Sequence, residues 1–592
     1  MRTLSPFRWS TLISGVAVLG LLLAACGPAS TPIPLDEPTA APTAGGAEPT
    51  AGSAEPTQAA EPTAAPVAAG GTVKISFVQE PDTLNPIYSA MYFSTITRDF
   101  WLRGLFIFDE QLNPVPQLAA EVPTTENGGI SADGKTITVK LREGVTWSDG
   151  EPVTGDDFVF TYEMIVSEKN TVQTRYPYDT VIDSVTAPDA GTVVIKLTQV
   201  FAAWRTSLFL FVLPKHVLQP VFDADGTLDN AEWNRAPTVG VGPFVYEEFE
   251  SGSHLSFVAN PNWFEPPSIE RVFIQIVPDD AAQEAAIIAG DVDLGLFLSS
   301  DQIERLEAGG AVKVVAVQSG YDEGWFLNLR EGLAHPAMLD KNVRLALALA
   351  TDRFTIVRDL LVEDLNPVNA TFWSNNPPYA SKTLEPYPYD PEKAMSLLDE
   401  AGWTDSDGDG IRDKMIDGKK VDLELRYVTT TRELRKNVQA VVAQQWEAVG
   451  IRADLRNVEA DQFFAGYADQ GPVAIGDFDV AEWSDLPTSF PDPDASEKWR
   501  CADIPTDDNP SGQNQGGYCN PEFDKLLEEQ SRITDADARI AVYEQIQQMM
   551  YDDVAYIGLW LDPDLWSINQ RVQGVSIGGV NPFWNVTTWT LK

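Results

Sequence analysis

Residues 131–164, SADGKTITVKLREGVTWSDGEPVTGDDFVFTYEM, decide the fold that we predict. Within them, Thr136–Leu141 alternates polar and apolar side chains, a period of two that is typical of a strand with one buried face. Asp133-Gly134 before the strand is a turn dipeptide. Further on, Thr154 can cap a helix, because acidic residues fill the first turn and apolar residues follow at helical spacing: Phe158, Val159, Tyr162 and Ile165.

The same region contains the pattern GxxxxGK[ST], from Gly129 to Thr136, which is also the pattern of a phosphate-binding loop. That chemistry needs a strand before the loop and a helix after it, so that backbone N–H groups converge on the phosphate. Here the predicted strand follows Lys135, and Asp133 would place a carboxylate against the nucleotide. We therefore interpret the match as accidental.

Residues 133–163, DGKTITVKLREGVTWSDGEPVTGDDFVFTYE, resemble the signature of the peptide- and nickel-type solute-binding proteins of ABC importers, the extracellular solute-binding proteins of family 5. Gly155 stands where that family has alanine. Other segments resemble the same family, and the resemblance covers about residues 72–592: Gln79–Pro86, Leu213–Leu218, Asn342–Arg353 and Tyr389–Trp403.

The resemblance implies an α/β type II periplasmic-binding-protein fold, with two lobes, a hinge and an extra subdomain inserted in lobe one. We place lobe one at residues 72–319 plus 565–592, its inserted subdomain at about 117–237, and lobe two at 320–564. Elsewhere, periodicity predicts a strand over Val73–Phe77 and, at the chain end, alternation at Val586, Thr588 and Thr590. It also predicts helices: Ile87–Phe106, Glu522–Arg532 and Ala536–Asp552.

The function that the resemblance implies is capture of a peptide or oligopeptide between the lobes and its delivery to a membrane permease and ATPase. The same scaffold binds oligosaccharides, nickel chelates and other solutes, so these stay open as alternatives. No cofactor is required for such a function, and we expect a monomer.

The N-terminus predicts export. Arg2 and Arg8 precede a short apolar run, which is typical of a signal peptide rather than of a spanning helix. The run ends Leu-Ala-Ala-Cys26, which resembles a bacterial lipoprotein signal, so we predict a signal peptide over 1–25 and a lipidated Cys26. Residues 26–71, rich in Pro, Ala, Thr and Glu, should form a disordered tether. The protein would be anchored at the cell surface or in the periplasm; the alternative is an ordinary signal peptide with an incidental cysteine.

The amino-acid composition argues against several classes of function. The 592 residues include 41 Lys and Arg against 87 Asp and Glu, a formal charge of −46. This balance argues against nucleic acid, whose binding needs clustered cations, and against docking on anionic lipid, which leaves the lipid anchor as the membrane contact. No GxSxG, HExxH or CxxC motif occurs. We predict that the chain is not an enzyme; a secreted carbohydrate-active enzyme is the alternative of a different class, since such enzymes need only a pair of carboxylates.

Two cysteines remain beyond Cys26. Because the chain should be exported, we predict a disulfide between Cys501 and Cys519; the alternative is two inert thiols. A zinc site is not expected, since none of the three histidines lies near either cysteine in sequence.

An acidic loop is a candidate metal site. Residues at loop positions one, three, five, seven and nine could wrap calcium, with Gly410 at position six. Ile416 stands at position twelve, where a calcium loop has a bidentate glutamate, so a polar turn is the alternative. The candidate ligands are Asp405, Asp407, Asp409, Ile411 and Asp413.

The candidate ligand site lies in Phe478–Phe490. This segment is expected to begin with a strand. The resemblance implies that a tryptophan and an aspartate after that strand contact the ligand, with the aspartate paired to a peptide α-ammonium group. Trp483 and Asp485 match by type. Their spacing is W-x-D, whereas the peptide binders have W-x-x-D, so Asp485 could instead be an acid of a surface turn.

Overall fold

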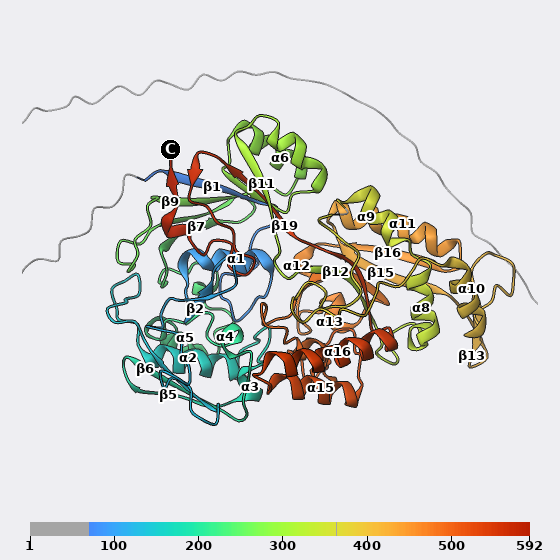
Figure 1. The fold of residues 1–592 in the computed structure, drawn as a ribbon, viewed down its shortest axis with the longest axis horizontal. Helices are drawn as coiled ribbons and strands as arrows, with labels where there is room; N and C mark the ends of the chain where they lie inside the picture. The colour runs from blue at the N-terminus through green and yellow to red at the C-terminus, as the bar shows by residue number, and fades with distance from the viewer. Residues whose placement is uncertain (1–69, 363) are drawn as a thin grey trace, which may run out of the picture. The chain divides into compact units, whose positions relative to one another are not determined.

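The computed structural model describes residues 70–362 and 364–592 (Figure 1). The predicted signal peptide, Cys26 and nearly all of the predicted tether lie outside the described residues. Among the described helices, none combines the length and the apolar character that crossing a membrane would require.

The structure confirms the strand and the helix predicted from residues 131–164. Strand β4 is Thr136–Lys140, with Ile137 and Val139 buried, and helix α2 is Gly155–Val166. The backbone N–H of Thr154 donates to the Asp157 carboxylate over 2.8 Å, which caps α2 as the sequence predicts. Because β4 begins directly after Lys135, the phosphate-loop pattern is followed by a strand and not by a helix.

Strand β4 belongs to a small antiparallel sheet of order β4-β6-β5, which α2 contacts along β5. This sheet lies within the segment predicted as the inserted subdomain. Its other strands are β5 (Ile182–Asp189) and β6 (Thr192–Leu197).

The first large sheet has seven strands in the order β11-β19-β10-β1-β9-β8-β7. Its central strand β1 (Thr72–Phe77) runs parallel to both neighbours, and Val73, Ile75 and Phe77 are completely buried, as their alternation predicts. The other strands are β7 (Phe244–Glu250), β8 (His254–Ala259), β9 (Arg271–Ile276), β10 (Leu294–Leu296), β11 (Val312–Val317) and β19 (Asp564–Asn569).

The second large sheet has five strands in the order β16-β15-β17-β12-β18. Strand β15 is parallel to β16 and β17, whereas β12 is antiparallel to β17 and β18. The strands are β12 (Asp322–Leu327), β15 (Glu424–Thr430), β16 (Arg452–Val458), β17 (Val480–Asp485) and β18 (Tyr556–Leu561).

The chain passes between the large sheets twice, through residues 318–321 and through residues 562–563. The two crossings touch, since the N–H of Asp562 donates to the carbonyl of Tyr321 over 3.1 Å. Gly320 has φ +86, and a Cβ there would lie 2.4 Å from the Phe490 ring, so the first crossing needs glycine. Two α/β lobes connected by two neighbouring crossings confirm the predicted fold class.

Helices cover the sheets of both lobes (Figure 1). In the chain before the first crossing they are α1 (Tyr92–Trp101), α3 (Tyr178–Val181), α4 (Trp204–Ser207), α5 (Lys215–Asp225), α6 (Asp280–Ala289) and α7 (Ile303–Glu307). Between the crossings they are α8 (Lys341–Leu349), α9 (Arg353–Leu360), α10 (Pro391–Glu400), α11 (Glu433–Glu447), α12 (Ala460–Phe463), α13 (Pro472–Ile475), α14 (Ser496–Trp499), α15 (Pro521–Ser531) and α16 (Ala536–Asp553). Short pairs complete the structure: β2 (Phe106–Phe108) with β3 (Pro114–Pro116), β13 (Asp413–Ile416) with β14 (Lys419–Asp422), and β20 (Val572–Gln573) with β21 (Thr590–Leu591).

Two predicted elements are shorter than expected. The helix predicted over Ile87–Phe106 is only α1, because Ser89 accepts from the N–H of Met91 in a turn before it. Near the chain end, Val586–Thr588 forms a 3₁₀ turn in place of extended chain, held by the carbonyl of Asn585, and only β21 is a strand. The predicted helices over 522–532 and 536–552 are present as α15 and α16.

The predicted bridge between Cys501 and Cys519 is present, with the two Cα atoms 4.6 Å apart. It ties the short turn after α14 to the chain entering α15. The disulfide therefore holds the start of α15 next to the end of α14, and α14 directly follows the loop after β17.

Candidate ligand site

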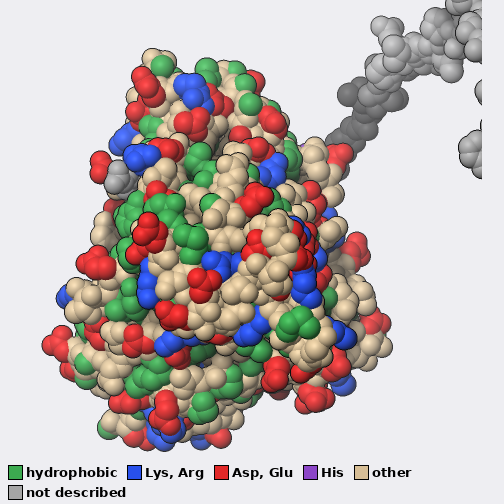
Figure 2. Space-filling view, turned by 90° about the vertical axis from the view of Figure 1, so that its right-hand side faces the viewer, with side chains coloured by type: hydrophobic (Ala, Val, Ile, Leu, Met, Phe, Trp, Pro, Cys, Tyr) green, Lys and Arg blue, Asp and Glu red, His purple; other side chains and the backbone are tan. Residues whose placement is uncertain are grey.

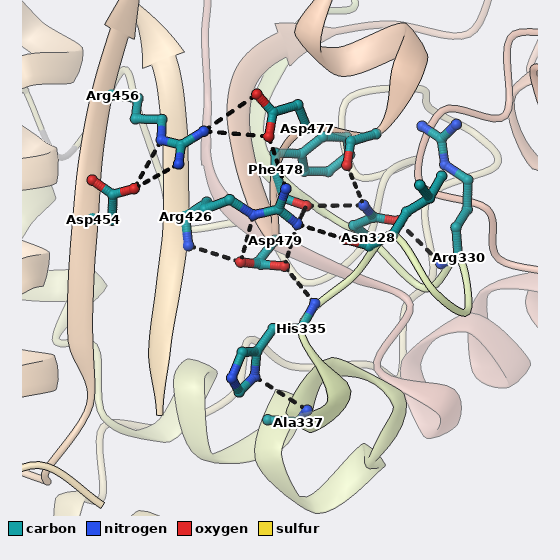
Figure 3. A network of polar contacts seen from close by, with 12 residues as sticks. Asn328, Arg330, His335, Ala337, Arg426, Asp454, Arg456, Asp477, Phe478 and Asp479 are labelled. Carbon is teal, nitrogen blue, oxygen red and sulfur yellow. Dashed lines mark hydrogen bonds and ion pairs between the residues drawn. The ribbon is translucent and has the colours of Figure 1, made fainter. Parts of the chain in front are cut away.

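Strand β17 carries the candidate ligand residues, and a polar network fixes its start (Figure 3). Asp479, directly before β17, is buried and accepts hydrogen bonds from the Arg426 side chain over 2.9 and 3.0 Å. The same carboxylate accepts from the N–H of His335 over 2.7 Å. Since β15, the loop before α8 and β17 converge on one carboxylate, the strand leaves this point in a fixed direction.

Trp483 and Asp485 lie two residues apart on β17 and therefore point to the same face of the sheet. The Trp483 ring is buried and stacks on Phe326 of β12, with ring centroids 3.7 Å apart. Trp499 of α14 is also nearly parallel to Phe326, at 5.8 Å. The Trp483 ring is thus packed into an aromatic cluster of lobe two, and the cluster joins β17 to α14.

Asp485 ends β17 and forms an ion pair with Lys498 of α14. The Lys498 ammonium nitrogen lies 2.9 Å from each carboxylate oxygen, and only 19% and 16% of the Lys498 and Asp485 side chains are exposed. The structure therefore places a cation of the protein itself on the carboxylate that the resemblance assigns to a ligand ammonium group.

A second acid lies beside this pair. Asp322 stands opposite Asp485 in the ladder between β12 and β17, and its side chain is completely buried. It accepts from the Asn369 amide over 2.6 Å and from the Tyr556 hydroxyl over 3.2 Å. Burial, and then the negative charge of Asp485, raise the Asp322 pKa well above its usual range.

The opposite face of β17 holds a buried charged cluster of Glu482, Glu323 and Arg435. The Arg435 guanidinium lies 2.8 and 3.0 Å from the two oxygens of Glu323. Glu482 accepts from the Tyr427 hydroxyl. Ser484 donates to Glu323, or alternatively to Asp562 in the second crossing, over 2.6 and 2.7 Å. The core of lobe two is thereby connected by hydrogen bonds to the second crossing.

The loop after β17 contacts lobe one. Thr174 donates to Glu497 over 2.8 Å, Tyr176 donates to Asp494 over 2.9 Å, and the hydroxyl groups of Ser207 and Ser489 are 2.6 Å apart. Thr174, Tyr176 and Ser207 belong to the segment that carries α3 and α4, so this segment forms one wall of the interface.

Small cavities remain along the interface. One, of about 70 Å³, is lined by residues of both walls, including Thr174, Tyr176, Glu497 and Arg500. A second, of about 30 Å³, lies against the second crossing beside Arg432 and Asp562. A ligand site for a small organic molecule measures about 300–1,000 Å³, so a peptide could enter neither cavity unless the lobes move apart.

Part of the predicted calcium loop comes together. Oxygens of Asp405, Asp407 and Asp413 lie within 4.8 Å of one another. The Lys420 ammonium contacts Asp407 and lies 4.0 Å from Asp413, so a lysine already supplies positive charge there. The Asp409 carboxylate instead accepts from the N–H of Ile411, whose side chain is buried. Calcium binding by this loop stays a prediction.

Some residues around the candidate site were not predicted from the sequence: Lys498, Asp322 and the lobe-one residues Thr174 and Tyr176. No local pattern marks them, because Lys498 reaches Asp485 only through the loop between β17 and α14. Asp322 could have been noticed as an acid at the start of an apolar strand segment. On the face shown in Figure 2, acidic and basic side chains of the described residues are interspersed.

Two α/β lobes that meet across a polar interface and share two neighbouring crossings define a bilobal solute-binding protein. Comparison with known proteins gives the family. The model of the bacterial extracellular solute-binding proteins, family 5, matches residues 113–502. The chain belongs to this family.

Individual relatives agree with this assignment. The oligopeptide-binding protein AppA of Bacillus subtilis is 30% identical over 534 residues, covering 88% of this chain and 92% of AppA. The heme-binding protein A of Haemophilus influenzae is 25% identical, covering 79% of this chain and 84% of that protein.

Solved structures show the same fold. The structure of AppA from Bacillus subtilis in complex with a nonapeptide superposes with a TM-score of 0.78 at 27% identity, covering 88% of this chain and 99% of AppA. NikZ from Campylobacter jejuni in complex with Ni(L-His) gives a TM-score of 0.74 at 24% identity, with coverage of 88% and 99%. The type II periplasmic-binding-protein fold predicted from the sequence is confirmed.

Proposed function

We propose that this protein is the extracellular peptide-binding subunit of an ABC importer, which takes up a peptide between its lobes and delivers it to a membrane permease and ATPase. The similarity to AppA over nearly the whole length of both chains carries the proposal. The two neighbouring crossings support it, because opening of the lobes about them would expose the C-terminal end of β17 and the loop that follows it. We further propose that the protein releases its ligand unchanged and acts as a monomer.

The proposal predicts a stable complex without turnover. Protein purified from its natural host should carry peptides that native mass spectrometry detects, and a mixture of synthetic peptides should raise its melting temperature, because a ligand that binds only the folded state stabilises it. Accumulation of cleaved peptides or of reducing sugar would contradict a transport role. A co-purified haem or nickel chelate would assign a different solute to the same scaffold.

We propose that Trp483 forms part of the peptide site together with Asp485. The variant Trp483→Phe keeps an aromatic ring against Phe326, but this ring is smaller than the indole. Peptide affinity should therefore fall roughly 3- to 10-fold, in line with about 0.5–1.5 kcal/mol for an aromatic contact. Trp446→Phe is the matched control, since Trp446 is buried against Trp325 in the same lobe and away from the loop after β17. Titration calorimetry measures the peptide affinity of both variants. If Trp483→Phe binds peptide as tightly as the wild type does, Trp483 is not part of the peptide site.

We propose that Cys26 anchors the protein to the membrane by a lipid, which the Leu-Ala-Ala-Cys26 sequence and the solute-binding family support. The variant Cys26→Ala should move the protein from the membrane fraction to the soluble fraction of the cell. Retention of the variant in washed membranes would rule the lipid anchor out.

A further inference from the structure

The end of β17 differs from a site built to hold a ligand ammonium group. Asp485 is the last residue of β17 and points to the side of Trp483, with Asp322 opposite it on β12. In the spacing W-x-x-D the acid would come one residue later, at the position of Leu486, beyond the strand. The shorter spacing therefore keeps Asp485 on the strand, within reach of α14.

The position of Lys498 is fixed by packing. Lys498 precedes Trp499, whose buried ring lies along Phe326 in the same cluster as Trp483. The N–H of Lys498 also donates to the carbonyl of Ala495 over 3.0 Å, which closes the turn of α14. One aromatic cluster thus holds β17 and α14 side by side. In this arrangement the Lys498 ammonium lies 2.9 Å from each carboxylate oxygen of Asp485.

The neighbouring acids are also satisfied. Glu497 accepts from Thr488 over 2.5 Å and from Thr174 over 2.8 Å, so both of its oxygens are engaged. Asp322 is buried and accepts hydrogen bonds from the Asn369 amide and the Tyr556 hydroxyl. Together with Asp485, Glu497 and Asp322 are acids that lie at the end of β17: Glu497 precedes Lys498 in α14, and Asp322 is opposite Asp485 in the strand ladder. Each of the three already has a hydrogen-bond or ion-pair partner within the protein.

We propose that Lys498 takes the place of the ligand's ammonium group, so that the part of the peptide reaching Asp485 is uncharged and a blocked N-terminus is accepted as well as a free one. The inference rests on the proposed peptide-binding function and specifies its substrate class. A free α-ammonium placed here would have to displace Lys498 from a largely buried ion pair and leave that lysine without its partner.

The test compares two synthetic peptide mixtures of identical composition, one with free N-termini and one N-acetylated, competing for the full-length protein in native mass spectrometry. The wild type should bind acetylated peptides at least as well as free ones. Lys498→Met removes the charge at nearly constant length and should shift the ratio at least tenfold towards free N-termini, because Asp485 is then open to a ligand cation. Lys525→Ala is the matched control, since Lys525 is an exposed lysine of the same lobe paired with Glu522.

A double variant separates charge from shape and from folding. Asp485→Asn combined with Lys498→Met leaves a neutral pair and should return the ratio to near one, while circular dichroism melting checks that each variant is folded. A tenfold preference of the wild type for free N-termini, or a ratio that Lys498→Met leaves unchanged, would overturn the inference. If neither mixture binds a folded wild type, the proposed peptide function fails and this inference falls with it.

Discussion

Replacement of Arg435 by methionine is expected to lower the free energy of unfolding by about 3–5 kcal/mol, the range for breaking a buried ion pair from one side. Arg435 and Glu323 are both buried and share two hydrogen bonds of 2.8 and 3.0 Å. Without the guanidinium group, Glu323 keeps only Ser484 as a donor and lies next to another buried acid, Glu482. Urea unfolding of the mature protein measures the loss.

Two variants control this prediction. Lys436→Met changes the next residue of α11, whose ammonium pairs with Glu433 at the surface, and should cost no more than about 0.5 kcal/mol. The double variant Arg435→Met with Glu323→Gln removes both charges and should recover part of the loss. If Arg435→Met unfolds within 1 kcal/mol of the wild type, the buried pair does not stabilise lobe two in the way that we expect.

The second large effect is on pH dependence and involves Glu482. Burial, followed by the charge of Glu323, raises the pKa of Glu482 from 4.5 to about 8. Between these values the folded protein holds a proton that the unfolded chain has lost, so the free energy of unfolding falls as pH rises through this window. The slope approaches about 1.4 kcal/mol per pH unit for one such group and vanishes above pH 8. Burial also raises the pKa of Asp564, from 3.8 to about 7. Asp564 therefore adds a further decrease in the free energy of unfolding as the pH rises from 3.8 to 7.

Glu482→Gln should therefore flatten the stability profile between pH 5 and pH 8, while the part due to Asp564 remains. Urea unfolding at unit pH steps measures both proteins, and Glu424→Gln, at an exposed acid on β15, serves as the control that keeps the wild-type slope. A wild type that is equally stable at pH 5 and pH 8 would contradict the assignment.

Two kinds of feature could be predicted from the sequence. Some are specified by residues close together in the chain, and others have few possible partners. The alternation in Thr136–Leu141 and the cap at Thr154 specify β4 and α2 because both depend on local periodicity and hydrogen bonding. The bridge between Cys501 and Cys519 was predictable because few other thiols compete.

Contacts between distant segments could not be predicted in this way. Arg435 and Glu323 are 112 residues apart and meet only because α11 packs against β15 and β16 of the sheet that also contains β12. Lys498 lies 13 residues from Asp485, but the loop between them contains three prolines and is shaped by contacts with lobe one, such as Thr174 with Glu497. Trp483 was predicted as a ligand contact, and its stacking on Phe326 follows from sheet register, which no local pattern encodes.

The strand order of the first sheet has a consequence for biogenesis. β19, close to the C-terminus, lies between β10 and β11 and pairs with both of them. An exported chain that emerges N-terminus first therefore leaves a missing strand between β10 and β11 until about residue 569 has been translocated. Lobe two, by contrast, is formed by the continuous segment from β12 to β18 and has all of its strands earlier. If the chain is exported as predicted, lobe one can therefore be completed only when nearly the whole chain has crossed the membrane.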